Sequence, residues 1–224
     1  MKLVWDKTGE RLYETGIKHG VLYIADETGK YKSGVAWNGL VGVSENPTGA
    51  EPTAIYADDM KYLNITSTEE FEGTIEAFTY PNEFKLCNGE ASLGGADTGV
   101  TIGQQARRIF AMSYRTTIGN DVLNNDYGYK IHIVYGCLIS PSEMSYQTIN
   151  DSPEAITMSW DFKSTPLPIS DPNNPKAKPT ATVVIDSTLV SPEKMKLFEE
   201  ALYGTDTEEA KLLLPEDILE ILAA

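Results

Sequence analysis

The sequence has few of the side chains on which catalysis and metal binding most often depend. Its 224 residues include two histidines and two cysteines, and no run of 18 or more apolar residues occurs. Cys87 and Cys137 lie 50 residues apart, and neither has a second cysteine or a histidine at the spacing of metal ligands. We therefore expect two buried cysteines, because free cysteine packs as a small apolar side chain, and no membrane-spanning helix.

Sequence motifs of the common enzyme classes are missing as well. No serine or cysteine lies in a nucleophile-elbow context beside His19 or His132, which disfavours a hydrolase triad. No phosphate-binding loop and no dinucleotide fingerprint occurs between a strand and a helix. The segments DVLNNDYG and YADD lack the spacing of a calcium loop, and turn-forming Asn and Asp explain them. The sequence predicts no cofactor, no metal ion and no enzymatic activity.

Basic residues are scarce, with 18 Lys and Arg against 33 Asp and Glu, for a formal charge of −15. Residues 43–99 hold eleven acids against Lys61 and Lys85, so these 57 residues carry −9 and the other 167 carry −6. Nucleic-acid binding requires Lys and Arg to neutralise phosphates, so this balance disfavours it. A negative surface suits a protein that has DNA as a neighbour and must not adhere to it.

The chain divides by composition into three expected parts. Residues 1–33 are an N-terminal arm with a first strand, GVLYIA; residues 34–190 are a β domain; residues 191–224 are a C-terminal helix and tail. The first residues, MKLVWDKTGERL, have neither the apolar core nor the small-residue cleavage site of a secretory signal. We expect a protein that is made and initially kept in a cytoplasm.

Three segments of the β domain alternate apolar and polar side chains with the period of a strand: ARRIFAMSYRTTI, YGYKIHIVYGCL and AITMSWDF. In the second, the odd positions from Tyr129 to Cys137 are apolar and are expected on one face. Turn signals such as IGNDVLNNDYG separate the strands. Two stretches rich in Gly and Pro, 44–59 and 82–104, are predicted to be long loops.

The C-terminal part changes to a helical pattern. Ser191 is suited to cap the helix, Pro192 fits its first turn, and Gly204 ends it. An apolar stripe is expected at Leu197, Phe198, Ala201 and Leu202. The predicted fold class is mainly β: an antiparallel β-sandwich or barrel-like fold with a flanking C-terminal α-helix and long loops.

One strand carries an unusual face. In EEFEGTIEAFTYP, the odd positions Phe71 and Ile75 point to a core, whereas Glu70, Glu72 and Glu76 share the opposite face, about 7 Å from i to i+2. Such like charges form a solvated face, a metal site, an acid/base pair or a wall that must stay negative. A glycosidase pair normally takes its carboxylates from different strands and flanks them with aromatic sugar platforms. The residues alone predict an acidic β-rich domain, a profile that suits self-assembly through open sheet edges.

Three longer segments of the sequence are more specific than its composition. They are GKYKSGVAWNGLVGVSENPTGAEPTAIYADDMKYLNITSTEEFEGTIEAFTYPNEFKLCNG, VTIGQQARRIFAMSYRTTIGNDVLNNDYGYKIHIVYGCLISPSEMSYQTINDSPEAITMSWDF, and PTATVVIDST with the helix and YGT that follow it. Together they cover roughly residues 30–204, in order and without large gaps. These runs resemble the major tail protein, or tail tube protein, of long-tailed bacteriophages with non-contractile tails.

The resemblance implies a fold and an assembly. Such proteins form hexameric rings that stack into a hollow tube through which the genome passes, and strands from all subunits of a ring combine into one barrel around the lumen. Long loops and terminal arms reach the neighbouring ring. The implied partners are other copies, the tape-measure protein, a tail terminator and the distal tail or baseplate protein. DNA passes without specific binding, the location is the virion tail after assembly in the host cytoplasm, and no enzymatic activity is implied.

Two site hypotheses follow from the resemblance. The first places Glu70, Glu72 and Glu76 on the lumen, the alternative being an outer solvated face. The second assigns ring stacking to loops 44–59 and 82–104, with these residues of the first loop: Glu45, Asn46, Pro47, Glu51, Asp58 and Asp59. The alternative functions are a β-sandwich carbohydrate-binding or adhesion module of a tail tip, which needs an aromatic-lined groove, and an acid-pair glycosidase.

Overall fold

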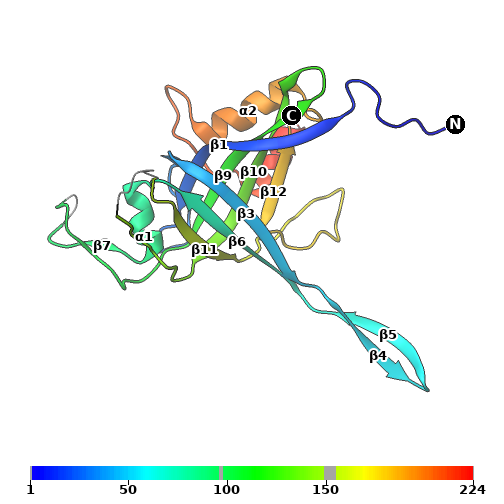
Figure 1. Cartoon of the computed structure of the whole chain (residues 1–224), viewed down its shortest axis with the longest axis horizontal. Helices are drawn as coiled ribbons and strands as arrows, with labels where there is room; N and C mark the ends of the chain where they lie inside the picture. The colour runs from blue at the N-terminus through cyan, green and yellow to red at the C-terminus, as the bar shows by residue number, and fades with distance from the viewer. Residues whose placement is uncertain (1, 96–97, 149–154, 224) are drawn as a thin grey trace.

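The computed structural model describes residues 2–95, 98–148 and 155–223. It is mainly antiparallel β with a helical C-terminal part, which confirms the predicted fold class (Figure 1). Its strands are β1 (Leu12–Ile24), β2 (Val35–Trp37), β3 (Leu40–Gly49), β4 (Pro52–Ala57), β5 (Met60–Thr66), β6 (Glu69–Ala77), β7 (Ala91–Ser92), β8 (Thr101–Ile102), β9 (Phe110–Asn120), β10 (Asn124–Ile139), β11 (Met158–Ser164) and β12 (Thr182–Asp186). Its helices are the short 3-10 helix η1 (Asn82–Phe84), α1 (Lys85–Asn88), α2 (Pro192–Tyr203) and α3 (Pro215–Ala223).

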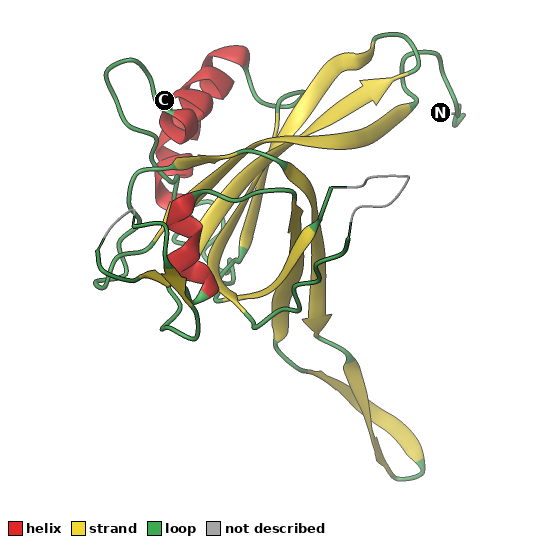
Figure 2. Cartoon of the chain, turned by 60° about the vertical axis from the view of Figure 1, so that its left-hand side comes forward, coloured by secondary structure: helices red, strands yellow, loops and turns green. Residues whose placement is uncertain are grey.

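In the described ranges, one sheet holds eight strands in the order β2-β1-β9-β10-β11-β6-β3, with β12 paired to β10. Strand β10 is shared: its middle residues, Lys130 to Val134, pair with β12, and its last residues, Cys137 to Ile139, pair with β11. The sheet curves strongly, so that its two ends approach each other (Figure 2). Two small hairpins, β4–β5 and β7–β8, stand apart from this sheet.

The sheet separates two hydrophobic cores. The inner core lies on its concave side and is dominated by aromatic side chains, among them Trp37, Phe84, Phe110, Trp160 and Phe162. The helix-side core lies between the opposite face and the C-terminal helices, and it includes Tyr23, Ile133, Tyr135, Phe198 and Leu202. Central strands are therefore buried on both faces, which is why Ala111 and Met112 are both buried.

A bulge in β10 lets this strand serve both cores. Before it, the odd positions such as Ile133 and Tyr135 pack in the helix-side core; after it, Cys137 packs in the inner core. The register with β9 shifts between Val134 and Cys137, and Gly136 there has a φ of +59°. The expectation that Cys137 shares a face with the odd positions before it was wrong, because the extra residue of a bulge reverses the alternation.

The predicted start and end of the first C-terminal helix are confirmed. The Ser191 side chain accepts a hydrogen bond from the Lys194 amide, Pro192 is in the first turn, and Gly204 follows the last residue of α2. Phe198 and Leu202 are buried as expected, whereas Leu197 is exposed. Met195 takes part in the buried stripe instead, one turn before Phe198.

Residues 44–59 are not the irregular loop that their Gly and Pro content predicted. Strand β3 continues to Gly49 because it stays paired with β6, down to the Gly49–Glu69 pair. Strand β4 then pairs with β5 through a turn at Asp58 and Asp59. In the second predicted loop, residues 82–95 and 98–104 contain η1, α1 and the two-residue strands β7 and β8, while residues 96 and 97 lie outside the described residues.

Both cysteines are free and buried, as predicted. Burial raises the pKa of the Cys87 thiol to about 12 and that of Cys137 well above its ordinary value, so both stay protonated and unreactive at neutral pH. Within the part of the chain that the structure covers, no helix has the length and apolar character to cross a membrane.

Candidate functional site

The β4–β5 hairpin projects from the body of the molecule. It prolongs β3 and β6 beyond the edge of the curved sheet and ends in a narrow tip (Figures 1 and 2). Every residue of β5 is exposed, and in β4 only Ala54 is partly covered. An isolated two-stranded hairpin is only marginally stable in water, so this hairpin lacks the support that a third strand or a helix gives elsewhere.

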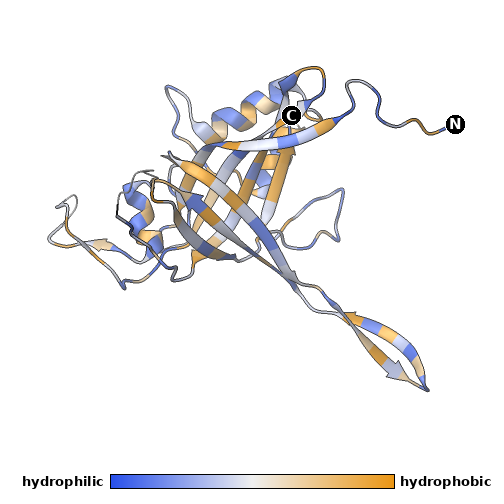
Figure 3. Cartoon of the chain, in the orientation of Figure 1, coloured by the Kyte–Doolittle hydropathy of each residue, from blue (hydrophilic) through white to orange (hydrophobic). Residues whose placement is uncertain are grey.

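The cross-strand register gives the hairpin one apolar face. The pairs Thr53–Ile65, Ile55–Leu63 and Ala57–Met60 share that face. The other face carries Pro52–Thr66, Ala54–Asn64 and Tyr56–Lys61. Orange and blue alternate along the hairpin in the hydropathy colouring (Figure 3). Met60 is 62% exposed and Ile65 is 54% exposed. A continuous apolar face that no described segment covers is typical of an interaction surface.

The tip of the hairpin consists of two adjacent aspartates. Asp58 and Asp59 have φ values of +51° and +59°, the left-handed pair that a tight type I′ hairpin turn requires. Asp tolerates this conformation better than most residues, although the Asn-Gly sequence suits it best. Both side chains are exposed, so the hairpin presents two negative charges at its far end.

The acidic face of β6 has the predicted alternation. Glu70 and Glu76 are exposed, while the odd positions from Phe71 to Ala77 are buried. Glu72 is half-buried and accepts a hydrogen bond from Lys163 of β11 at 2.5 Å, which raises the pKa of that lysine. The Thr74 hydroxyl donates to Asp161 at 2.7 Å, so β11 adds one carboxylate and one ammonium to the same face. The three glutamates therefore share a predominantly negative outer face of the sheet.

The six residues predicted for stacking occupy three places in the structure. Glu45 lies within β3, and its carboxylate accepts a hydrogen bond from the Tyr114 hydroxyl at 2.5 Å. Asn46 and Pro47 are exposed on β3, where they pair with Glu72 and Phe71 of β6. The other three belong to the projecting hairpin: Glu51 directly precedes β4, and Asp58 and Asp59 form the tip.

A polar network joins four strands on the concave side of the sheet. The His132 ring stacks on Tyr114, with 4.8 Å between the ring centroids, and its Nε2 lies 3.4 Å from a Glu14 carboxylate oxygen. Glu14 also accepts hydrogen bonds from Thr116 at 2.5 Å and Lys130 at 2.6 Å.

Burial raises the pKa of Tyr114, and the neighbouring Glu45 carboxylate raises it further, so the hydroxyl stays a donor to Glu45. For Glu14, burial acts to raise the pKa, but the hydrogen bonds from Lys130 and Thr116 outweigh it and the pKa is lowered. Sequence reasoning missed this network, because its members come from β1, β3, β9 and β10. The one signal was a histidine on the polar face of a strand.

The described residues show little that could bind a metal ion or a carbohydrate substrate. Among the described residues, no group of three or more His, Cys, Asp or Glu is arranged to hold a metal ion. A broad pocket lies beside the hairpin base, and Phe71 is the single aromatic among the described residues that line it. A sugar-binding groove needs several exposed rings, so this pocket does not favour the carbohydrate-binding alternative.

Comparisons with known proteins give limited likeness. No family model matches the chain, and no curated protein matches it at a significant level. Among solved structures, the sheath/tube terminator of an extracellular contractile injection system, PVC, in its extended state is 8% identical and gives a TM-score of 0.33 over 82% of this chain and 99% of that one. The sheath-tube complex of that system in the extended state is 10% identical, with a TM-score of 0.32 over 75% of this chain and 88% of that one. TM-scores this low carry no argument about function.

Proposed function

We propose that this protein is a structural subunit that assembles with copies of itself into hexameric rings stacked as a phage tail tube. The observation that carries the proposal is the projecting β4–β5 hairpin, whose apolar face Ile55, Ala57, Met60, Leu63 and Ile65 is left in solvent by the single chain. Removing such a face from water contributes about 25 cal/mol per Å² of apolar surface, and this gain must exceed the loss of translational and rotational freedom on association.

A second copy is the occupant that best fits this face. The hairpin projects from one end of the subunit (Figure 1), and in the proposed tube it contacts a different surface of the next copy. Such head-to-tail contacts either close into rings or propagate as filaments, and a stacked tube requires both closure and propagation. The sequence resemblance to tail tube proteins, in which long loops reach the neighbouring ring, agrees with this arrangement.

The acidic face of β6 is proposed to line the lumen. Glu70 and Glu76 lie on the side of the sheet that faces away from the inner core, and neither makes an ion pair with the described residues. Six copies in a ring multiply these charges into a negative belt that repels DNA phosphates, so the genome passes without adhering. The proposal gives the chain no catalytic role. Its partners are the tape-measure protein, a terminator and the distal tail or baseplate protein.

The first experiment follows self-assembly of the purified chain. Wild-type protein is examined over a range of concentrations by negative-stain electron microscopy and sedimentation velocity. Rings or hollow tubes with six-fold end views are expected. A wild-type chain that stays monomeric at every concentration, also when mixed with its tail partners, would contradict the proposal.

A second experiment removes the hairpin without disturbing the sheet. Residues 50–68 are replaced by Asn-Gly, so that the Gly49–Glu69 pair is closed by a two-residue turn. The expected product is a folded monomer with unchanged strand content that does not form tubes. Removing residues 46–52 would be a poorer test, because residues 46–49 are paired with β6.

A point variant isolates the apolar face. Ile55→Thr with Leu63→Thr makes the apolar face polar, while threonine, a β-branched residue that is common in strands, preserves the hairpin. This variant is expected to block assembly. The matched control places the same residue on the opposite face, Ala54→Thr with Asn64→Thr. Equal assembly of the two variants would contradict the proposal that the apolar face of the hairpin contacts another copy.

A further inference from the structure

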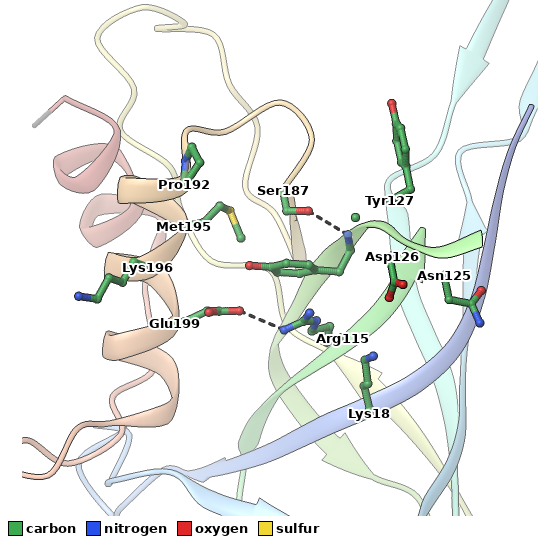
Figure 4. A pocket seen from close by; sticks show the side chains of 12 residues that line it. Lys18, Arg115, Asn125, Asp126, Tyr127, Ser187, Pro192, Met195, Lys196 and Glu199 are labelled. Atoms are coloured by element: carbon green, nitrogen blue, oxygen red, sulfur yellow. Dashed lines mark hydrogen bonds and ion pairs between the residues drawn. The ribbon is translucent and has the colours of Figure 1, made fainter. Parts of the chain in front are cut away.

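A surface pocket of about 490 Å³ lies at the start of α2, on the opposite side of the body from the hairpin (Figures 1 and 4). Its walls come from α2, from the start of β10, from Lys18 of β1 and from Arg115 of β9. The buried Met195 side chain lies at its base. The pocket is separate from the acidic face and the apolar hairpin face described above.

Cations gather around this pocket although the protein as a whole carries −15. Lys18 and Lys196 stand on two of its walls, with Arg115 between them (Figure 4). Lys18 is exposed and makes no ion pair with the described residues, and Lys196 is 75% exposed and contacts only Glu200, at 3.5 Å. This set is called the basic pocket below: Lys18, Arg115 and Lys196.

Carboxylates neutralise part of the positive charge of this pocket. Glu199 is engaged by Arg115, with 3.1 Å between the Nη1 and Oε1 atoms, and the Arg115 guanidinium lies 3.4 Å from the centre of the Tyr129 ring. Asp126 lines the opposite wall. The same cations lie near His19: partial burial lowers the pKa of His19, Arg115 and Lys18 lower it further, and Glu199 acts in the opposite direction. Among the lining residues, three cations therefore face two carboxylates, and Arg115 and Glu199 pair with each other. Lys196 also lies 3.5 Å from Glu200, whereas Lys18 has no ion-pair partner among the described residues.

The hairpin tip has the complementary chemistry. Asp58 and Asp59 are adjacent, exposed and held at the end of a projecting hairpin, and their carboxylates repel each other in the isolated chain. The hairpin tip and α2, which lines the basic pocket, lie on different sides of the body and far apart in both views (Figures 1 and 2). One copy therefore cannot satisfy its own tip, but a head-to-tail neighbour can.

We propose that the Asp58–Asp59 tip of one copy binds the basic pocket of the next copy in the stack. The inference rests on the proposed self-assembly and adds the receiving surface to it. The apolar hairpin face supplies affinity, whereas the charged tip and pocket select the register and the orientation of the contact, as complementary charges do at other interfaces. The tip is then the element that distinguishes a correctly stacked neighbour from a nonspecific apolar contact.

The test compares assembly of neutralised variants. Asp58→Asn with Asp59→Gly removes both tip charges and gives the turn its preferred sequence, so any loss of assembly is not a loss of hairpin structure. Lys18→Gln with Lys196→Gln neutralises the pocket. Each variant is expected to raise the protein concentration for half-maximal assembly by about tenfold at low salt, and by less at high salt, because exposed charges are screened.

Matched controls change the net charge by the same amount elsewhere. Glu208→Gln with Glu209→Gln is the control for the tip, and Lys30→Gln with Lys32→Gln is the control for the pocket, because all four side chains are exposed. The controls are expected to assemble as the wild type does. The fourfold variant, with tip and pocket both neutralised, is expected to be no worse than either parent, because the two changes remove one shared interaction.

The outcomes separate this inference from the function on which it rests. If the wild type assembles and the tip variant matches its control, the tip–pocket contact is wrong although the proposed function stands. If the tip and pocket variants weaken assembly independently, so that their effects add in the fourfold variant, the two surfaces do not meet and the inference is overturned. If the wild type does not assemble at all, the proposed function itself fails.

Discussion

The body of the sheet and the β4–β5 hairpin differ in how far their side chains are buried. In the body, the central strands are buried on both faces, and side chains from up to six strands meet in the inner core. In the hairpin, two strands pair with each other alone, and nearly every side chain is exposed. The same chain therefore contains one part that is stabilised by itself and another that has backbone pairing but no core of its own.

This difference separates stability from assembly. Changes in the body are expected to alter the free energy of unfolding with little specific effect on the interface, whereas changes in the hairpin are expected to do the reverse. The lack of a core in the hairpin is also the reason that its apolar face remains available to a neighbour. Four measurements test this contrast, and they are given in order of decreasing expected change in stability.

The largest effect is expected from Phe84→Ala. Phe84 is fully buried, and its ring contacts those of Trp37, Trp160 and Phe110, with 4.5 Å, 5.1 Å and 5.7 Å between the centroids. Removing it leaves a cavity among aromatic side chains, at a cost of about 3–5 kcal/mol in the free energy of unfolding, measured by urea denaturation. Phe78→Ala is the control, because Phe78 is 50% exposed. Equal losses in the two variants would contradict the inner core as described.

The bulge in β10 is the next most sensitive point. A Cβ at Gly136 would lie 2.4 Å from the Thr165 carbonyl oxygen, and the φ of +59° disfavours any side chain there. Gly136→Ala is expected to cost about 2 kcal/mol or more, because left-handed backbone alone costs roughly 1–2 kcal/mol and the close contact adds to it. The midpoint of urea unfolding measures this change. A neutral substitution would show that the bulge is not rigid.

A smaller effect, which depends on pH, is expected from Glu14→Gln. The pKa of Glu14 is lowered from 4.5 in the folded protein, so its ion pair stabilises the fold above pH 4.5, and this contribution is lost as the pH falls through the lowered value. The Glu14 side chain is 36% exposed, so screening limits the effect to about 1 kcal/mol or less. The difference in unfolding free energy between wild type and variant should shrink as the pH falls below 4.5 and through the lowered pKa of Glu14. A difference that grows on acidification would reverse the assigned sign.

The smallest change in stability is expected where the effect on assembly is greatest. Ile55→Thr with Leu63→Thr is predicted to alter the unfolding free energy of the monomer by less than about 0.5 kcal/mol, as is typical of exposed positions. Differential scanning calorimetry of dilute protein measures this. A loss comparable to that of Phe84→Ala would mean that the hairpin packs on its own body in solution, and the contrast between the two regions would disappear.

Sequence reasoning recovered the elements with strong periodicity. The alternation in β6 and the cap of α2 at Ser191 are both local, so the residues themselves specify them. The class of the fold followed from the number of alternating segments. These are features for which neighbours in the chain decide the structure, with little contribution from distant residues.

The rest depended on pairings between distant residues. Asn46 and Pro47 are depleted in strands, yet pairing with β6 keeps them in β3. The Asp58–Asp59 turn lacks the Asn-Gly signature and was not recognised as the end of a hairpin. Likewise, nothing near Gly136 in the sequence specified the bulge that moves Cys137 to the other core. Whether the acidic face lines a lumen depends on other copies, and it stays a prediction.

The continuity of the hairpin with the sheet has a mechanical consequence. Only two residues separate β3 from β4 and two separate β5 from β6, so a pull on the tip is transmitted almost directly along the backbones of β3 and β6. The hydrogen bonds that hold these strands to each other and to β11 lie across the direction of pull. They are loaded in shear and share the force, instead of opening one after another. A tube linked through such hairpins would resist stretching and bending while each subunit remains only modestly stable.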